Sequence, residues 1–279
     1  MGKAKDILLR PIPAAQANEL VKRVHYSGKV VQNSQIHIGV FFDGRLEGAM
    51  QFGPSLDKRK IQGLVSGTLW HEFIELNRMA FSEALPRNSE SRAIAIAMRL
   101  LKQHAPQIKW VISFADGAQC GDGTIYRASG FVLTGIKQND RLIHLPTGEV
   151  CSYLTFDMSG GFGDFDTLGG SKSVSLKRRE MLASGFQKTD DYLNARYPGW
   201  YALPGFQLRY IYFIDPTYRQ RLKVPELPYS EIERMGARMY KGQRLQAAEA
   251  IEDATGDQPE EGGASPTLPL HSSGVPDHG

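Results

Sequence analysis

The segment GTIYRASGF places a tyrosine, Tyr126, four residues before the pair Gly130-Phe131. Glycine is the residue that most often ends a helix in the left-handed conformation, so this spacing predicts a short helix over residues 123–129 that stops at Gly130. Phe131 then opens an apolar run that reads as a strand. The sequence therefore fixes a titratable phenol one helical turn before a core strand.

Two charged residues lie in otherwise apolar runs. Arg78 lies inside FIELNRMAFS (73–82), and Asp116 ends IKWVISFAD (108–116). A buried guanidinium without a partner is too costly, so Arg78 must pair or face a pocket. The end of a strand is where open α/β sheets place their sites. Either Arg78 and Asp116 form an ion pair, with Glu75 as another partner for Arg78, or both line a catalytic cleft in which Asp116 is a base or metal ligand.

His25 and Tyr26 stand in VHYSGK, a turn-forming stretch from which a polar pair can reach a site. His25 is a candidate base or metal ligand, and a hydrogen-bonded structural pair is the alternative. His25, Tyr26 and Asp116 would together offer nitrogen and oxygen donors suited to non-haem iron, although no spacing rule links them. Cys120 is interpreted as a buried thiol, because nothing near it in the sequence would lower its pKa.

These residues need strands and helices to position them. Apolar periodicity predicts an α/β arrangement in which strands 73–82, 108–116 and 131–137 form a βαβαβ-like unit with the helices between them. The other predicted elements are a hairpin over 36–53 that turns at Asp43-Gly44, an amphipathic helix over 88–105 capped by Asn88 or Ser89, helices within 171–198, a strand at 205–215, and a helix over 230–242 with Ser230 and Glu233 as a capping box.

The start of the helix at residue 88 is a candidate binding site for an anion. A helix N-terminus after a strand presents unpaired N–H groups to a phosphate. The surrounding donors are Arg87, Asn88, Ser89, Ser91 and Arg92. A capped surface helix is the alternative, and spacing alone favours it.

Composition indicates a globular chain with an uneven charge distribution. Apolar residues make up 41% of the 279 positions, and two cysteines form no disulfide framework, which fits a reducing cytoplasm. No apolar run is long enough for a membrane span, and the first 16 residues, which contain two prolines, do not read as a secretory signal. We expect a catalytic core over 1–170, a basic, aromatic-rich part over 171–245 packed on it, and an acidic tail over 246–279 that is disordered from about residue 248.

The basic part carries 14 Lys and Arg against 7 Asp and Glu, which suits contacts to phosphates. The aromatic residues Trp200, Tyr201, Tyr210, Tyr212 and Tyr218 are interleaved with arginines, and such a pattern stacks bases or simply builds a β-core. A solvated surface is the other interpretation of the charge. The candidate DNA contacts are Lys58, Arg59, Lys60, Lys177, Arg178, Arg179, Arg209, Arg219 and Arg221.

The run ELNRMAF…PRNSESRAIAIAMRLL…WVISFADG…IYRASGF resembles the conserved half of GNAT acyltransferases. That resemblance implies a twisted mixed sheet flanked by helices, a bulged strand that binds the pantetheine arm of acetyl-CoA or a related donor, and a loop that cradles pyrophosphate. It implies that Tyr126 is the general acid, a role that an ordinary phenol pKa near 10 allows. The implied cofactor residues are Leu76, Asn77, Met79, Phe81, Arg87, Asn88, Ser89 and Ser91. The loop PRNSES departs from the glycine-containing pattern, so its side chains would crowd a pyrophosphate.

A longer set of motifs is similar to the Mom family of phage DNA-modification proteins. It adds HYSGKVVQNSQIHIGVFFDGRLEGAMQFGPSLDKRK and GFQLRYIYFIDPTYRQRL, and covers roughly residues 20–225. The resemblance implies a cytoplasmic enzyme, acting in the host cell if phage-encoded, that adds a carbamoylmethyl group to N6 of adenine in double-stranded DNA and blocks restriction. It also implies an association with iron.

The expected chemistry needs a base, because the N6 lone pair is delocalised into the purine ring. Asp116 or His25 would take the proton, Tyr126 would protonate the leaving group or hold the donor, and Arg78 would stabilise charge. A carbamoylmethyl product joins nitrogen to a CH2 carbon, so the donor is unusual, or later chemistry rebuilds an acyl adduct, or an iron centre takes part. The alternatives are an acetyl-CoA-dependent N-acetyltransferase and a non-catalytic DNA-binding protein on the same scaffold.

Overall fold

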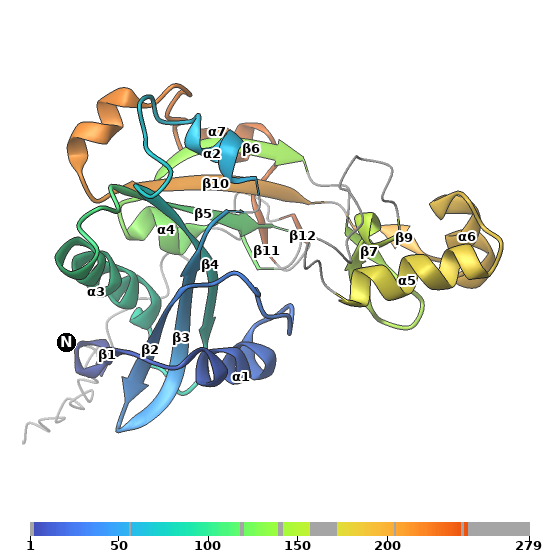
Figure 1. Ribbon diagram of the computed structural model, residues 1–279, viewed down its shortest axis with the longest axis horizontal. Helices are drawn as coiled ribbons and strands as arrows, with labels where there is room; N and C mark the ends of the chain where they lie inside the picture. The colour runs from blue at the N-terminus through green and yellow to red at the C-terminus, as the bar shows by residue number, and fades with distance from the viewer. Residues whose placement is uncertain are drawn as a thin grey trace, which may run out of the picture. The chain divides into compact units, whose positions relative to one another are not determined.

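The central feature of the computed structural model is a seven-stranded mixed sheet in the order β1-β2-β3-β4-β5-β10-β6. The structure describes residues 3–55, 57–117, 120–138, 142–156, 172–203, 205–240 and 243–244. Only the β4–β5 pair among these seven strands is parallel. In Figure 1 the strands β2 to β4 run at a large angle to β5, β10 and β6, because the sheet is strongly twisted. The strands are β1 (Leu8–Pro11), β2 (Ile36–Phe42), β3 (Arg45–Gly53), β4 (Phe73–Phe81), β5 (Trp110–Asp116), β6 (Val132–Gln138) and β10 (Phe206–Phe213).

Helices cover the two faces of this sheet. The helices α3 (Ser89–His104) and α4 (Thr124–Ala128) pack on the face that carries Val111, which we call face A. The helices α1 (Ala14–Val24) and α2 (Lys58–Gln62) pack on the opposite face, which carries Ile112 and Ala49 and which we call face B. Successive residues of a strand point to opposite faces, so each strand residue can be assigned to one of them. The expected α/β class, with a central mixed sheet flanked by helices, is confirmed.

Several local predictions are confirmed. The hairpin β2–β3 turns at Asp43 and Gly44, whose φ angles of 47° and 76° are both left-handed. The helix α3 begins where predicted, with Asn88 as N-cap, but the Asn88 side chain makes no cap hydrogen bond and its φ is 67°. Asparagine tolerates this conformation better than most residues, so Asn88 makes a turn that glycine would otherwise make. Gly130, with φ 83°, follows α4 as expected.

The βαβαβ-like unit is wrong in one respect. Strands β5 and β6 are not neighbours, because β10 returns antiparallel between them and pairs with both. The predicted helix over 230–242 is also too long: α7 covers Ser230–Arg234, and β11 (Met239–Tyr240) and β12 (Gln243–Arg244) follow. Its capping box is wrong, since the N-cap is Tyr229 and no side chain caps the helix.

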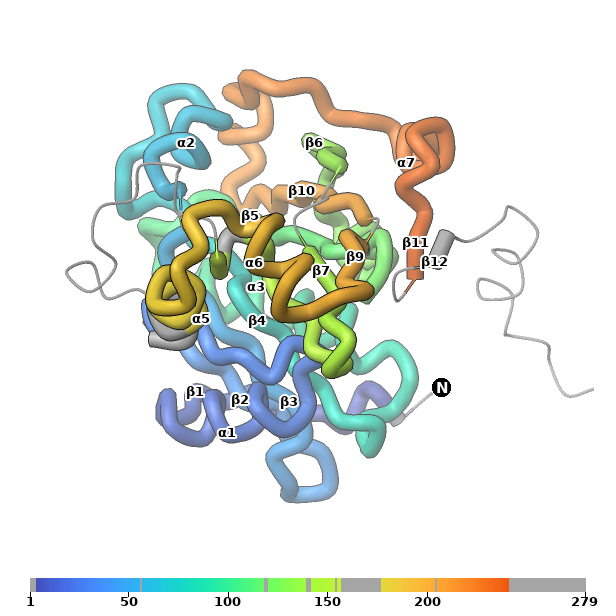
Figure 2. The backbone as a smooth tube through the Cα atoms, turned by 90° about the vertical axis from the view of Figure 1, so that its right-hand side faces the viewer, coloured from blue at the N-terminus to red at the C-terminus, as the bar shows by residue number. Residues whose placement is uncertain are grey.

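A smaller unit is inserted between β6 and β10. Its three-stranded sheet, β8-β7-β9, packs with the helices α5 and α6 around a separate core that contains Ile143, Phe156 and Tyr192. Figure 2 shows β7, β9, α5 and α6 grouped together. The elements are β7 (Leu142–His144), β8 (Val150–Ser152), α5 (Lys172–Ala183), α6 (Thr189–Arg196) and β9 (Tyr201–Ala202), and short 3-10 helices lie at Lys3–Asp6, Tyr153–Thr155 and Pro216–Arg221.

The connection points of this insertion lie at one end of the main sheet. Lys137, near the end of β6, pairs with Gln207, near the start of β10, and Gln207 also pairs with Asp116. The expected boundary at residue 170 and the expected tail over 246–279 lie outside the described residues. Strand β10, from the expected C-terminal part, belongs to the main sheet.

Candidate active site

The parallel strands β4 and β5 separate partway along their length. They pair from Phe73↔Trp110 to Glu75↔Ile112 and no further within the described ladder. Beyond this point the Ser113 hydroxyl donates to the Leu76 carbonyl at 3.3 Å, so a side chain replaces the backbone ladder. The sheet therefore opens toward the carboxyl ends of β4 and β5.

A β-bulge in β4 accompanies this opening. Gln51 of β3 pairs with Arg78, whereas the next residue, Phe52, pairs with Leu76, so Asn77 is the extra residue. Bulges re-aim side chains and occur next to active sites more often than elsewhere. The bulged strand that the GNAT resemblance implied is thus present in β4.

A cavity of about 580 Å³ occupies the opening between the strands. It brings together the five residues singled out as catalytic from the sequence, although they come from the segment after α1 and from β4, β5 and α4. Residues of both sheet faces line it, so the cavity passes through the sheet. Its lining includes His25, Tyr26, Glu75, Leu76, Asn77, Arg78, Met79, Phe81, Glu90, Phe114, Asp116, Cys120, Ile125, Tyr126 and Gln207.

The face A side of the cavity is mainly apolar and carries one phenol. Tyr126 is buried against Phe131 and Tyr210, with ring centroids 5.3 Å from each. Burial raises the pKa of Tyr126 to about 12, and its hydrogen bond with Ser113 opposes part of that rise. Tyr126 is therefore a protonated donor at neutral pH.

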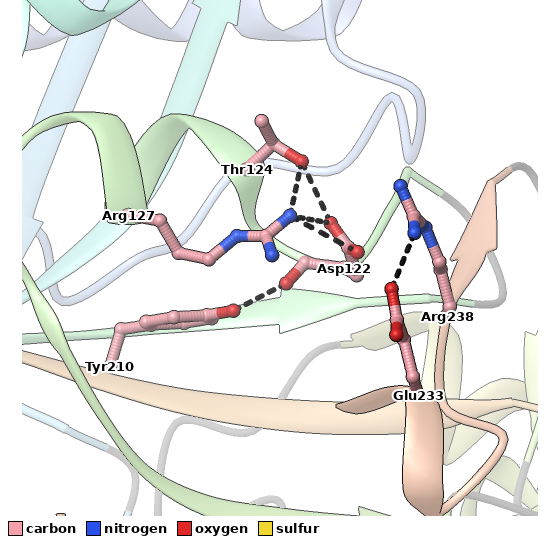
Figure 3. A network of polar contacts seen from close by, with 6 residues as sticks. All are labelled: Asp122, Thr124, Arg127, Tyr210, Glu233 and Arg238. Atoms are coloured by element: carbon pink, nitrogen blue, oxygen red, sulfur yellow. Dashed lines mark hydrogen bonds and ion pairs between the residues drawn. The ribbon is translucent and has the colours of Figure 1, made fainter. Parts of the chain in front are cut away.

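A polar network fixes the start of α4 and so positions Tyr126 (Figure 3). The Arg127 guanidinium lies 3.1 Å from an Asp122 carboxylate oxygen, and Thr124 donates to the same carboxylate at 2.9 Å. The Tyr210 hydroxyl donates to the Asp122 carbonyl at 2.5 Å. Gly123, the N-cap, has φ 84° and lies so close to Tyr210 that a Cβ would be 2.4 Å from its Cε2. The ring of Tyr210 thus holds α4 against the sheet.

The face B side carries a carboxyl group whose catalytic potential the sequence reading missed. Glu75 is the last β4 residue that pairs with β5. Burial raises the pKa of Glu75 above its ordinary value, while hydrogen bonding from Asn77 and the charge of Arg78 act in the opposite direction. A carboxyl group with a raised pKa is better matched to proton abstraction near neutral pH. The signal in the sequence was a glutamate inside an apolar strand, interpreted only as a partner for Arg78.

His25 is held in one tautomer by the loop that follows it. The Ser27 backbone N–H donates to Nδ1 at 3.1 Å, and the Ser27 hydroxyl lies 2.8 Å from the same atom. Nδ1 is therefore an acceptor, and the neutral ring carries its proton on Nε2. Burial, with a smaller effect from Arg78, lowers the pKa of His25 to about 4. A neutral ring whose Nε2 carries the proton is a hydrogen-bond donor, so this arrangement disfavours the expected role of His25 as a base.

Tyr26, Asp116 and Cys120 lie together in the lining of the cavity. Tyr26 as a residue is 53% exposed, and its ring lies against the His25 ring at a centroid distance of 4.1 Å. Burial of the phenol oxygen raises the Tyr26 pKa, and the neighbouring Cys120 and Asp116 raise it further. Cys120 donates to the Asp116 carbonyl at 3.1 Å, and burial raises its thiol pKa. These features agree with the interpretation of Cys120 as an unreactive thiol.

Arg78 is oriented by backbone acceptors. Its Nε donates to the Lys29 carbonyl at 3.0 Å, and one terminal nitrogen donates to the Asn77 carbonyl at 2.7 Å. Its register with Gln51 places it on face B, as Glu75 is. Arg78 thus brings a fixed positive charge to the side of the cavity that carries the carboxyl groups.

The proposed iron ligands do not fit a metal ion in this arrangement. Among the described residues, no group of three or more His, Cys, Asp or Glu side chains is placed to hold one. The Ser27 N–H occupies the Nδ1 lone pair of His25 and stabilises the tautomer whose Nε2 carries the proton, so neither ring nitrogen offers a free lone pair to a metal ion. Arg78 disfavours a positive charge on His25, and a bound cation would meet the same repulsion.

The expected phosphate loop is divided between two places. Asn88 and Ser91 line a second cavity of about 550 Å³, together with Arg92 and Arg99 of α3 and with residues of the N-terminal 3-10 helix and the end of α4. Ser89 is fully buried, and its hydroxyl donates to the Pro86 carbonyl at 2.5 Å. Ser89 is therefore held inside the fold, and Arg87 lines neither cavity.

The candidate DNA contacts lie in three places: one end of the main sheet, its cavity end, and helix α5 of the smaller unit. Lys58, Arg59 and Lys60 lie on α2, and Arg219 and Arg221 lie in the 3-10 helix beside it, where a hydrogen bond joins Arg221 Nε to the Ser66 carbonyl at 2.7 Å. This group adjoins the start of β5, whereas the cavity adjoins its end, about 20 Å away at 3.3 Å per residue. Arg219 pairs with Glu226 at 2.6 Å, and Lys177 of α5 pairs with Glu149 at 2.5 Å.

Arg209 lies at the cavity end, on face B. Its guanidinium donates to the Thr134 hydroxyl and carbonyl at 3.0 and 2.6 Å and lies over Gly135. Tyr210 and Tyr218 are buried, so these two rings belong to the core. Tyr201 is 52% exposed and stacks on His144. Arg178 and Arg179 do not line the cavity.

The model of the Mom protein family matches residues 6–231. The chain belongs to the Mom protein family. A curated relative, the methylcarbamoylase Mom of Escherichia phage Mu, is 38% identical over 137 residues. That alignment covers 49% of this chain and 56% of the relative, so the two proteins are compared over about half of their lengths. The expected family is thereby confirmed.

The solved structures that resemble this Mom-family chain include acetyltransferases. One is a Bacillus subtilis acetyltransferase in complex with CoA, with 12% identity, a TM-score of 0.33 and coverage of 48% of this chain and 80% of that chain. Another is a spermidine/spermine N-acetyltransferase of Vibrio cholerae, with 8% identity, a TM-score of 0.39 and coverage of 78% and 98%. None of the helices in the described part of the chain is long and apolar enough to cross a membrane.

Proposed function

We propose that this Mom-family protein transfers a carbamoylmethyl group to N6 of adenine in double-stranded DNA. The product would protect phage DNA from restriction in the host cytoplasm. The observation that carries the proposal is the cavity through the sheet, with a polar face B side and a mainly apolar face A side that presents Tyr126. Membership of the Mom family and the methylcarbamoylase activity in the name of the phage Mu relative support it.

The acceptor adenine enters from face B. A base within a duplex cannot reach a cavity, so it is extruded, at a cost of a few kcal/mol. Glu75 and Asp116 line this side and are the candidate bases. One of them takes a proton from N6 as the nitrogen attacks. Glu75 has the stronger claim, because burial raises its pKa.

The donor occupies the face A side. It belongs to the class of acetamides that carry a leaving group on the CH2 carbon. The N6–CH2 bond forms, the bond from CH2 to the leaving group breaks, and Tyr126 protonates the leaving group. The apolar wall of Leu76, Met79 and Phe81 would hold a carrier of the CoA type along the bulged strand, with its phosphates directed toward Asn88 and Ser91.

The cations and donors of face B hold the transferred group. His25 donates from Nε2 to the carboxamide oxygen of the donor, and Arg78 stabilises the ionised form of Glu75 on the same face. Neither role requires a change of protonation state in these two residues. No step passes through a metal ion.

Mass spectrometry of nucleosides from the DNA of cells that express the protein tests this proposal. A deoxyadenosine heavier by one carbamoylmethyl group, absent from cells that express Tyr126→Phe, is the expected result. Unmodified DNA together with turnover of acetyl-CoA by the purified protein would instead identify an N-acetyltransferase. Binding to DNA with neither product would identify a non-catalytic DNA-binding protein.

A further inference from the structure

Gln207 occupies a distinctive position beside the cavity. It lies on β10 directly opposite Asp116 of β5, and it lines the same cavity. Directly paired side chains on one face of a sheet have Cβ atoms about 5 Å apart. Gln207 is exposed, and among the described residues its amide has no hydrogen-bond partner. A carboxamide thus projects beside a candidate catalytic carboxylate without a structural role of its own.

The neighbours of Gln207 complete a surface suited to a nucleotide. Lys137 of β6 pairs with Gln207 on its other side and is exposed, so Asp116, Gln207 and Lys137 form a row across three strands of face B. The next row contains Phe114 and Arg209, and Phe114 lines the cavity. The row leads from a carboxylate, through an uncharged amide, to a cation. In this order, the carboxylate can meet an amino group, the amide can meet the edge of a base, and the cation can meet a phosphate.

We propose that Gln207 recognises the target adenine by binding its Hoogsteen edge. This inference rests on the proposed function. A carboxamide has one acceptor oxygen and an NH2 donor, and the Hoogsteen edge of adenine offers an N6–H donor beside the N7 acceptor, so the two fit as a bidentate pair. Guanine presents two acceptors, N7 and O6, and its O6 would meet the amide oxygen. The same side chain thus accepts adenine and disfavours guanine.

The pairing leaves N6 ready to react. One N6–H points to the Gln207 oxygen, while the other points away from N7, toward the carboxyl groups of the cavity. Glu75 or Asp116 can remove that second proton. The Phe114 ring, on the same strand face as Asp116, offers a surface on which the purine can stack. Gln207 therefore acts on base choice and positioning rather than on bond making.

A binding experiment with a modified base isolates this contact. The probe is a labelled duplex pool with one adenine opposite an abasic site and randomised neighbours, so that extrusion costs little. A second pool carries 7-deazaadenine, in which a C–H replaces N7. By fluorescence anisotropy, the wild-type protein should bind the adenine pool on the order of tenfold more tightly than the 7-deaza pool.

Two variants show whether Gln207 causes the difference. Gln207→Ala should bind both pools equally, because the N7 contact is already lost. Gln138→Ala is the matched control, since Gln138 is an exposed amide on β6 that points to face A and does not line the cavity; it should keep the wild-type preference. Equal binding of both pools by the wild type, or an undiminished preference in Gln207→Ala, would overturn the inference.

Nucleoside mass spectrometry separates this inference from the proposed function. Modified deoxyadenosine should fall on the order of tenfold in cells that express Gln207→Ala and stay unchanged with Gln138→Ala. Absence of modified deoxyadenosine with the wild type would refute the proposed function and, with it, this inference. Normal modification by the wild type together with equal binding of the two pools would refute only the inference.

Discussion

The backbone N–H of Ser27 donates a hydrogen bond to Nδ1 of His25 at 3.1 Å. The histidine that looks like a base in the sequence is thereby fixed with its proton on Nε2, and the residue lines the cavity. The pKa of about 4, caused by burial and by Arg78, keeps this ring neutral. The structure thus favours a donor role for His25 over the base and ligand roles.

The lowered pKa of His25 predicts a pH dependence of stability. The unfolded chain binds a proton at this residue below pH 6.5, whereas the folded chain binds it only near pH 4. Stability is therefore lost as the pH falls from 6.5 to 4, by about 1–2 kcal/mol after allowance for the partial exposure of the ring. Urea unfolding at pH 7 and pH 5 measures this loss. The loss of stability should be smaller in His25→Gln than in the wild type. An equal loss in the two proteins would show that protonation of His25 is not its cause.

Tyr126→Phe should abolish modification without unfolding the protein. The ring packing remains and only the hydroxyl bonded to Ser113 is removed, so we expect a cost of about 1 kcal/mol in stability. Loss of a general acid should lower the rate by about 10²- to 10⁴-fold. Nucleoside mass spectrometry and a thermal melt measure both effects.

Tyr212→Phe is the control for this variant. Tyr212 packs on Phe131 on the same sheet face but does not line the cavity. It should modify DNA at the wild-type level. Modification by Tyr126→Phe at the same level as Tyr212→Phe would remove Tyr126 from the mechanism.

Glu75→Gln tests which carboxyl group is the base. If Glu75 takes the N6 proton, wild-type activity should rise with pH as this carboxyl ionises, and the midpoint should lie above the ordinary value of 4.5 because burial raises the pKa. Glu75→Gln should lower the rate by about 10²-fold or more, and its activity should no longer rise with pH over this range. The exposed Glu83→Gln serves as control. If activity still rises with pH in Glu75→Gln and no longer does so in Asp116→Asn, the base is Asp116.

Gly123→Ala should destabilise the protein strongly. The new Cβ would lie 2.4 Å from Tyr210 Cε2, and the left-handed φ of 84° is itself unfavourable for alanine. Strain and overpacking together predict a loss of about 2–4 kcal/mol. Gly148→Ala is the matched control, because Gly148 has φ 83° with nothing within 4 Å of a new Cβ, and it should lose only about 1 kcal/mol. Urea unfolding of both variants gives the comparison, and equal losses would rule out the contact with Tyr210.

Charge reversal at the two ends of the sheet should have unequal effects on DNA binding. The phosphates of the nearest base pairs lie within about 10 Å of the target adenine along one strand. Lys137, which lies beside Gln207, is therefore better placed than Lys60 on α2 to contact a phosphate. Lys137→Glu should weaken binding and reduce the slope of log affinity against log salt by about 1, with a smaller change for Lys60→Glu. A salt titration by anisotropy measures both slopes. A larger change for Lys60→Glu would place the duplex at the α2 end instead.

The sequence by itself determined the local elements and the residue types of the site. The positive-φ turn at Asp43-Gly44, the amphipathic period of residues 88–105 and the glycine stop at Gly130 depend on near neighbours in the chain, and each was predictable for that reason. The cost of burying Arg78 inside an apolar strand likewise predicted that this residue would either pair with an acceptor or face a pocket. The order of motifs was sufficient to predict the family.

Only the tertiary structure decided how these residues meet. The insertion of β10 between β5 and β6, the end of β4–β5 pairing at Glu75 and the position of Gln207 opposite Asp116 are long-range pairings that no local pattern encodes. The His25 tautomer depends on the geometry of one loop, and the raised pKa of Glu75 depends on burial by distant segments. Because sheet register and desolvation arise from contacts between segments far apart in the chain, the acid–base roles in this site became assignable only in the folded protein.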